Sequence, residues 1–144
     1  HGDDGWEVTV LDTGLDTMTG ARIKQAEPFI HGDRVMVTYG DGVADIDLHA
    51  LVAHHTAAGR LATITGVRPP ARFGELVVDG DRVAEFREKP QVQHGLINGG
   101  FFVFERGVFD YLSADPGCVL EQAPLERLAA DGQLSVFRHD TFWR

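Results

Sequence analysis

The pattern of apolar and polar positions predicts alternating strands and helices. A β-branched apolar run at 35–38 ends in a Gly-Asp-Gly turn around Asp41, and apolar positions then recur at helical spacing over 48–55. A second apolar run, 61–67, follows a glycine that is expected to end the helix. A strand, a helix and a strand in this order form a βαβ unit, and a continuous apolar strand is typical of a sheet covered on both faces. We therefore expect an α/β fold with a mixed, mostly parallel sheet flanked by helices.

Shorter signals predict the remaining elements. Alternation over 6–12 indicates a strand, and two runs on either side of 79–81 indicate an antiparallel hairpin. Asp45 and Asp47 could each cap the helix that ends at Gly59. The other expected elements are a short helix within 13–24, a strand at 101–104, helices near 107–114 and 121–130, and a strand at 134–137.

The charge balance narrows the range of partners. The chain has 13 lysine and arginine residues against 22 aspartate and glutamate residues, a formal net charge of −9. This charge argues against a module that binds nucleic acid or an anionic membrane surface. Both lysines, Lys24 and Lys89, and the arginines Arg22, Arg68 and Arg72 lie in stretches with other functional signals. Their placement suggests a local site for a phosphorylated small molecule.

Cysteine usage and hydropathy bear on the compartment. The single cysteine, Cys118, cannot form an intrachain disulfide, which fits a reducing cytosol. No apolar stretch approaches the length of a transmembrane helix, and no secretory signal opens the chain. We therefore expect a cytoplasmic protein.

Three stretches carry candidate chemistry. Asp41 follows a strand, where ligands of α/β proteins bind, and its flanking glycines leave room for a metal or ligand. An ordinary turn has the same pattern. The segment 13–24, rich in glycine and hydroxyl groups, could cradle an anion at a helix start, although its spacing is not that of a P-loop and a capped helix is the commoner explanation. Asn98 offers a donor and acceptors to sugar hydroxyls.

Six motifs together resemble the sugar-phosphate nucleotidylyltransferases, specifically the glucose-1-phosphate cytidylyltransferases. They occur in the family's order and cover almost the whole chain. The matching motifs are Asp-Thr-Gly at 12–14 with Thr-Met-Thr-Gly at 17–20, Thr-Tyr-Gly-Asp-Gly at 38–42, Pro-Pro-Ala-Arg-Phe-Gly at 69–74, Glu-Lys-Pro at 88–90, Ile-Asn-Gly-Gly-Phe-Phe-Val at 97–103 and Phe-Trp at 142–143.

The resemblance implies a Rossmann-like nucleotidyltransferase fold and a reaction of CTP with α-D-glucose 1-phosphate that gives CDP-glucose and pyrophosphate. It also implies a Mg²⁺ requirement, a homo-oligomer, and a role in lipopolysaccharide O-antigen biosynthesis. No general base is required, because the attacking phosphate is already ionised, and so neither His94 nor His139 is given a catalytic role.

The resemblance also assigns residues. Asp41, as the metal ligand, and Lys89, on the sugar phosphate, are the implied catalytic pair. The implied nucleotide-binding residues are Thr13, Thr19, Gly20, Arg22 and Asp41. The implied sugar-phosphate-binding residues are Tyr39, Gly74, Glu88, Lys89, Asn98, Gly99 and Trp143.

The sequence departs from the family at Ala21, where a glycine is usual, at Arg144, where a glutamine is common, and in two segments that bear on activity. The family's Gly-rich triphosphate-binding segment does not occur in the chain, and its second metal-binding aspartate lies beyond the motif at 142–143. We therefore expect residues 1–144 to be the central and C-terminal portion of a single, incomplete nucleotidyltransferase domain, with little or no activity when expressed alone.

Three alternatives stay open. The chain could be a noncatalytic module that binds a nucleotide sugar or supports assembly. It could belong to a sibling pyrophosphorylase that uses UTP, dTTP or GTP. It could also be a glycosyltransferase that uses the Asp-x-Asp motif of Asp45 and Asp47, although helix capping explains these residues better.

Overall fold

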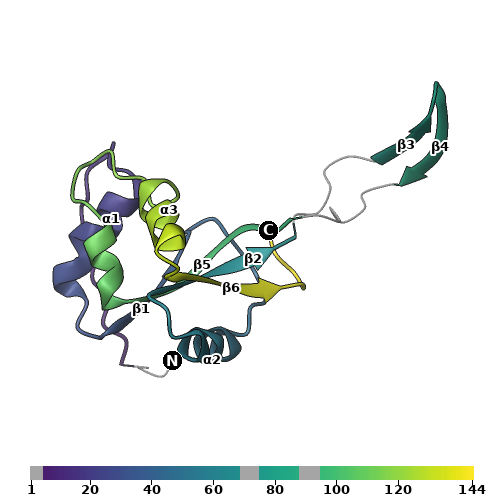
Figure 1. The fold of residues 1–144 in the computed structure, drawn as a ribbon. Helices are drawn as coiled ribbons and strands as arrows, with labels where there is room; N and C mark the ends of the chain where they lie inside the picture. The colour runs from purple at the N-terminus through teal and green to yellow at the C-terminus, as the bar shows by residue number, and fades with distance from the viewer. Residues whose placement is uncertain (1–4, 69–74, 88–94) are drawn as a thin grey trace. The chain divides into compact units, whose positions relative to one another are not determined.

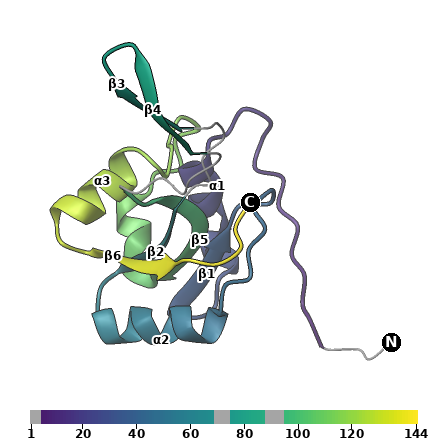
Figure 2. The same ribbon diagram turned by 90° about the vertical axis from the view of Figure 1, so that its right-hand side faces the viewer.

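A computed structural model describes residues 5–68, 75–87 and 95–144 (Figures 1 and 2). Four strands form one sheet in the order β1-β5-β2-β6, and two more form a separate hairpin. The sheet strands are β1 (Arg34–Thr38), β5 (Ile97–Glu105), β2 (Ala62–Val67) and β6 (Leu134–His139). The mixed α/β sheet flanked by helices that the sequence predicts is confirmed.

Backbone hydrogen bonds fix the strand directions. Tyr39 N donates to Gly100 O, whereas Arg106 N donates to Asp33 O, so β1 and β5 run antiparallel. Because Glu105 N donates to Leu61 O and Gly99 lies against Thr65, β2 is also antiparallel to β5. β1 and β2 are therefore parallel to each other, as the βαβ pattern predicts, with β5 between them.

β6 extends the sheet in parallel with β2. Ala62 N donates to Gln133 O at 3.0 Å, and the hydroxyls of Thr63 and Ser135 are 2.6 Å apart. Both strands therefore end at the same edge of the sheet.

The chain divides into two compact units. The first comprises His1–Val35, Arg60–Ala62 and Phe104–Leu134, and the second comprises Met36–Gly59, Thr63–Val103 and Ser135–Arg144. None of the described helices is long and apolar enough to cross a membrane.

Helices and a buried apolar cluster build the first unit. Its helical elements are α1 (Thr19–Ala26), η1 (Glu27–Phe29), η2 (Arg106–Tyr111) and α3 (Ala123–Ala130). Its buried apolar residues include Ala21, Val108, Phe109, Leu112, Leu120, Leu125 and Leu128. Gly20 permits close packing, since a Cβ there would lie 2.8 Å from Cys118 Sγ.

α2 (Leu48–Ala58) packs on the sheet in the second unit. Asp47 accepts a hydrogen bond from Ala50 N at 2.9 Å and caps the helix, and Gly59 ends it in the left-handed conformation, both as the sequence predicts. On the face toward β2, His55 Nδ1 lies 2.7 Å from Thr63 Oγ1. Both side chains are buried, so this polar contact is part of the core.

The predicted hairpin is confirmed as a two-stranded antiparallel unit. β3 (Glu75–Asp79) pairs with β4 (Arg82–Arg87), with Asp79 opposite Arg82. Gly80 has a φ of +60°, which a turn of this length requires.

Two predictions about the N-terminal half are wrong. Residues 6–12 form no strand, and Trp6, Val8 and Val10 are 84%, 77% and 89% exposed. Alternation shows only that a segment could pair, and no described strand lies beside this one. β1 is not covered on both faces, because its residues alternate between exposed and half-buried, with Met36 44% exposed. It is also an edge strand of the described sheet.

Two elements differ in type or length from the prediction. The helix expected near 107–114 is the six-residue 3-10 helix η2. The strand expected at 101–104 begins earlier, at Ile97, and so includes Asn98 and both glycines. The glycines do not end the strand, because their missing side chains allow neighbouring residues to pack against it.

Candidate functional site

The turn after β1 presents an open carboxylate. Asp41 is exposed, and within the described ranges it makes no hydrogen bond or ion pair. A Cβ placed on Gly40 or Gly42 would meet nothing within 4 Å. Protein packing therefore does not require these glycines, and space around the carboxylate is left for a ligand.

The last residues of the chain fix the segment that follows this turn. Val43 and Arg144 exchange two backbone hydrogen bonds of 2.8 Å, and Asp45 N donates to Phe142 O at 3.2 Å. Ala44 and Trp143 form the antiparallel bridge between them. We call residues 142–144 the strap, since they hold the Asp41 loop in place.

Tyr39 and Asn98 meet at the end of the sheet where β1 finishes. Asn98 Nδ2 donates to Tyr39 Oη at 2.8 Å, and Gly100 N donates to Asn98 Oδ1 at 2.8 Å. Gly100 has a φ of +78°, and a Cβ there would lie 2.5 Å from the Tyr39 ring. Glycine is therefore required at this position for two independent reasons.

Trp143 joins the same cluster. Its Nε1 donates to Gly99 O at 2.8 Å, and a Cβ on Gly99 would lie 2.8 Å from Val67 Cγ1. The structure thus brings together four of the predicted sugar-phosphate residues: Tyr39, Asn98, Gly99 and Trp143. The remaining three, Gly74, Glu88 and Lys89, lie outside the described residues.

The aspartates of the Asp-x-Asp motif are occupied by protein groups. Asp47 caps α2, and Asp45 Oδ1 accepts from Thr141 Oγ1 at 2.6 Å and lies 3.1 Å from His139 Nε2. The Thr141 hydroxyl, together with the charge of His139, lowers the pKa of the Asp45 carboxyl from its usual value of 3.8. Among the described residues, no three His, Cys, Asp or Glu side chains form a metal-binding group. The capping interpretation is confirmed for Asp47.

The predicted nucleotide-binding loop belongs to the first unit. Arg22 Nη1 donates to Thr13 Oγ1 at 2.5 Å, and Nη2 donates to Leu15 O at 3.1 Å, so the guanidinium lies over the loop. Thr19 Oγ1 donates to Glu121 Oε2 at 2.8 Å and accepts from Leu120 N at 3.0 Å.

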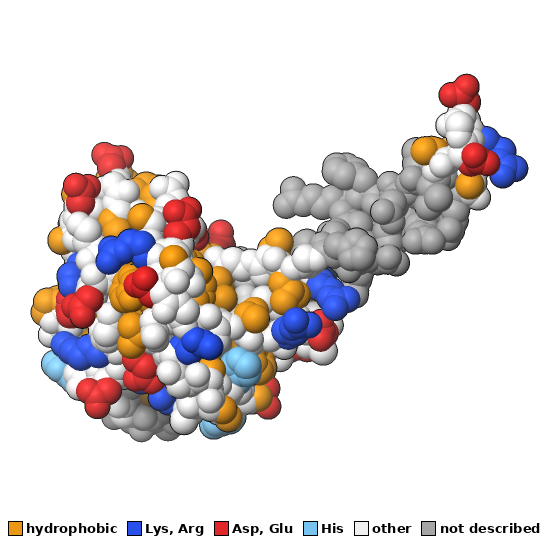
Figure 3. Space-filling model, in the orientation of Figure 1, with side chains coloured by type: hydrophobic (Ala, Val, Ile, Leu, Met, Phe, Trp, Pro, Cys, Tyr) orange, Lys and Arg blue, Asp and Glu red, His pale blue; other side chains and the backbone are white. Residues whose placement is uncertain are grey.

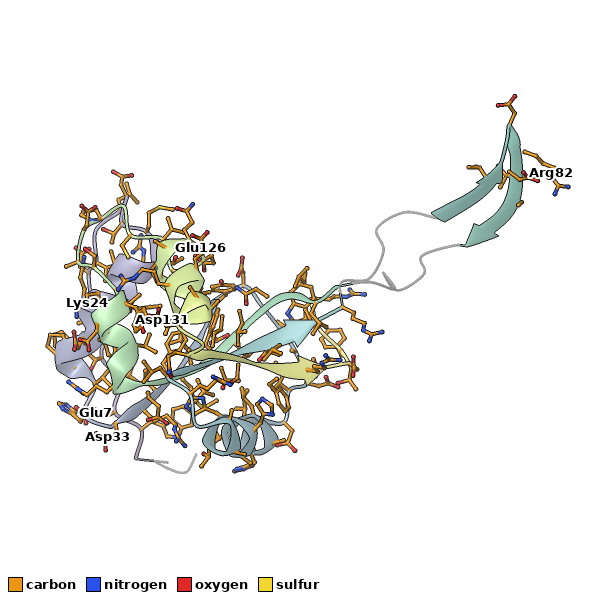
Figure 4. The ribbon with its side chains drawn as sticks, viewed as in Figure 1. Glu7, Lys24, Asp33, Arg82, Glu126 and Asp131 are labelled. Carbon is orange, nitrogen blue, oxygen red and sulfur yellow. The ribbon has the colours of Figure 1, made fainter. Side chains whose placement is uncertain are left out.

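Contacts within the unit therefore already use much of this loop. Gly20 is buried, and Lys24, labelled in Figure 4, pairs with Glu27 at 2.7 Å and donates to Phe109 O at 2.9 Å. Arg22 is exposed, and its guanidinium donates to groups of the loop itself.

The chemistry of Asp41 fits Mg²⁺. This ion prefers hard oxygen ligands and is usually held by one or two carboxylates, with waters and substrate phosphates completing its shell. An exposed carboxylate in an open glycine turn, with no partner among residues 5–68, 75–87 and 95–144, meets that requirement. Asp41 belongs to no group of three or more His, Cys, Asp or Glu side chains among the described residues.

Sequence reasoning missed the roles of two residues of β6, only one of which belongs to this site. His139, given no role above, contacts Asp45 and donates to Phe142 O at 3.0 Å, and so anchors the strap. The signal was its place at the end of an alternating strand, where one face is buried. Arg138, on the opposite face of that strand, lines a cavity described below.

Comparisons with known proteins agree on one family. A family model described as nucleotidyl transferase matches residues 7–143. A Bacillus subtilis (strain 168) protein named "Probable glucose-1-phosphate cytidylyltransferase" is 45% identical over 138 residues, covering 96% of this chain and 54% of the relative. The glucose-1-phosphate cytidylyltransferase of Salmonella typhi is 44% identical over 140 residues, with the same coverage.

The fold agrees as well. The solved structure of HddC from Yersinia pseudotuberculosis matches with a TM-score of 0.62 and 22% identity, over 88% of this chain and 55% of that one. The chain thus spans about half the length of the curated relatives it matches. On its match over nearly all its residues, the chain belongs to the nucleotidyl transferase family.

Proposed function

We propose that this chain takes part in cytidylyl transfer from CTP to α-D-glucose 1-phosphate. A phosphate oxygen of the sugar phosphate forms a bond to the α-phosphorus of CTP, the bond from that phosphorus to the bridging oxygen breaks, and pyrophosphate leaves. No proton has to move, because the nucleophile is an anion. The relatives named as cytidylyltransferases, at 44–45% identity, support this choice of substrates.

The chemistry asks the protein mainly for positioning and for neutralisation of phosphate charge. Asp41 would hold Mg²⁺, and the ion when bound neutralises charge on the phosphates. Asn98, oriented by Tyr39, would hydrogen-bond the sugar. We propose Lys89 for the sugar phosphate and Arg22 for the nucleotide.

One observation carries the proposal most. The strap links the open Asp41 turn to the cluster of Tyr39, Asn98 and Gly99, since Trp143 both pairs with Ala44 and donates to Gly99 O. A metal ligand and candidate sugar ligands are thus tied together at the end of the sheet where ligands of α/β proteins bind.

Titration of the 144-residue chain with CDP-glucose, with and without Mg²⁺, tests the proposal. We expect Mg²⁺ to strengthen binding, and Asp41→Asn to remove the metal-dependent part, roughly a tenfold loss. Asp33→Asn is the matched control, because Asp33 is an exposed aspartate at the opposite end of β1 (Figure 4). Equal binding by all three proteins with Mg²⁺ would contradict the assignment.

Turnover is a separate question. The chain spans 54% of its relatives, and we propose that alone it binds the sugar nucleotide with little catalysis. Robust formation of CDP-glucose from CTP and glucose 1-phosphate by the purified chain would overturn that expectation and would favour a complete active site.

The second candidate function is that of a sibling pyrophosphorylase that uses a nucleoside triphosphate with another base. The chain is 34% identical over 99 residues to a UTP–glucose-1-phosphate uridylyltransferase of Synechocystis. Competition of UDP-, dTDP- and GDP-sugars against CDP-glucose distinguishes the siblings. A noncatalytic binding module would bind CDP-glucose equally with and without the metal.

A further inference from the structure

A polar cavity lies at the edge of the sheet where β2 and β6 end. It measures about 310 Å³, within the range of small-molecule sites. Its described lining residues are Arg68, Gly95, Leu96 and Arg138. None of these residues belongs to the site described above.

The fold brings the two arginines together from distant parts of the sequence. β2 and β6 are parallel neighbours, and Gly66 on β2 faces Val136 on β6, with 2.7 Å between its added Cβ and Val136 Cγ2. Alternate residues of a strand share a face, so Arg68 and Arg138, two positions further on, extend that face to the edge. Leu96 packs on the same glycine and forms the floor beside them.

Among the described residues, little neutralises the charges of Arg68 and Arg138. Arg138 is exposed and, in the part of the chain that the structure describes, its side chain makes no hydrogen bond or ion pair. Arg68 makes one long contact, 3.9 Å from Nε to Asp140 Oδ1, between side chains that are 45% and 69% exposed. Figure 3 shows Lys and Arg side chains gathered over the ends of β2 and β6. In a chain of net charge −9, two arginines that line one cavity indicate a binding site for an anion.

We propose that Arg68 and Arg138 form a phosphate-binding site. Each guanidinium can donate two parallel hydrogen bonds to a phosphate, and the pair matches the charge of a phosphate dianion. The ligand is a phosphorylated small molecule or a free phosphate ion. Only the identification of that molecule with glucose 1-phosphate rests on the proposed function.

Nuclear magnetic resonance titration of the 144-residue chain, following the arginine Nε–H signals, tests the site. One arm uses inorganic phosphate, the second glucose 1-phosphate and the third CTP. We expect Arg68→Gln and Arg138→Gln each to weaken binding about tenfold, and Arg68→Lys to recover part of it. Arg127→Gln is the matched control, because Arg127 is exposed, stacks on Tyr111 and does not line the cavity.

Asp140 supplies a test of opposite sign. Its carboxylate competes with the anion for Arg68 and repels it, so Asp140→Asn should strengthen phosphate binding a few-fold. Circular dichroism checks that every variant folds like the wild type. If Arg68 only stabilised the fold, Asp140→Asn would not strengthen phosphate binding while Arg68→Gln weakened it.

The outcomes separate this site from the proposed function. Tighter binding of glucose 1-phosphate than of phosphate, lost in both arginine variants, assigns the site to the substrate. Arginine-dependent binding of inorganic phosphate alone supports the site as an independent one, even if metal-dependent CDP-glucose binding fails. No phosphate binding, or the same affinity in the arginine variants and the Arg127→Gln control, overturns it.

Discussion

At the scale of single residues, the environment of Gly100 shows how backbone and neighbour together dictate residue type. Its φ of +78° disfavours any other residue, and the Tyr39 ring occupies the space of a side chain. The sequence pointed to Asn98 and the glycines as a candidate site, but a positive φ and a ring contact cannot be predicted from composition. Because Gly100 has no side chain, the Tyr39 ring fits beside it, and Tyr39 can accept the hydrogen bond from Asn98.

Gly100→Ala should destabilise the protein by roughly 1–3 kcal/mol through the strained backbone, with the ring contact adding to this. Urea unfolding measures the loss. Gly40→Ala, where nothing lies within 4 Å, is the control and should change stability by less than about 0.5 kcal/mol. Equal effects of the two substitutions would show that the Gly100 geometry is wrong.

The contacts of Asp45 with Thr141 and His139 make the free energy of unfolding depend on pH. Because the pKa of Asp45 is lower in the folded protein than its usual 3.8, its carboxylate stabilises the fold above that value. This contribution is lost as the pH falls through the lowered pKa. Urea unfolding of wild type and Asp45→Asn at about pH 6 and about pH 3 should therefore show a stability gap that narrows in acid.

The control for this pH dependence is Asp16→Asn, at an exposed aspartate of the first unit. Like Asp45→Asn, this change removes one exposed carboxylate, so it separates the loss of the contacts made by Asp45 from the loss of a negative charge. A gap between wild type and Asp45→Asn that widens in acid would contradict the assigned direction.

At the scale of elements, regular segments could be predicted and pairing could not. The period of 3.6, the Asp47 cap and the Gly59 stop are local signals, and α2 begins and ends as they indicate. The strand predicted at 6–12 does not form, and β1 lies at the edge of the described sheet. Both outcomes depend on which strands lie beside these segments. That information lies in the whole sheet rather than in any one segment.

Asp47→Ala should cost about 0.5–2 kcal/mol, because Ala50 N loses its acceptor at the start of α2. Asp33→Ala, at an exposed aspartate that caps no helix, is the control and should be nearly neutral. Thermal unfolding compares the two, and a neutral Asp47→Ala would remove the cap from the account of α2.

At the scale of the whole molecule, two candidate sites lie at the sheet edge of the second unit. The Asp41 turn with the Tyr39–Asn98 cluster is one, and the cavity of Arg68 and Arg138 is the other. The sequence motifs indicated the first through the resemblance to a family. They did not indicate Arg138, because only the parallel pairing of β2 and β6 places it beside Arg68.

The central proposal is that Asp41 holds a divalent cation next to the cluster of Tyr39, Asn98 and Gly99, for which we propose sugar binding. Mn²⁺, a paramagnetic substitute for Mg²⁺, added with CDP-glucose tests it most directly through the broadening of amide signals. The account predicts that the Asn98 side-chain amide and the Gly100 amide broaden, and that Asp41→Asn abolishes this whereas Asp33→Asn does not. Broadening centred on residues 45–47, or broadening that persists in Asp41→Asn, would contradict it.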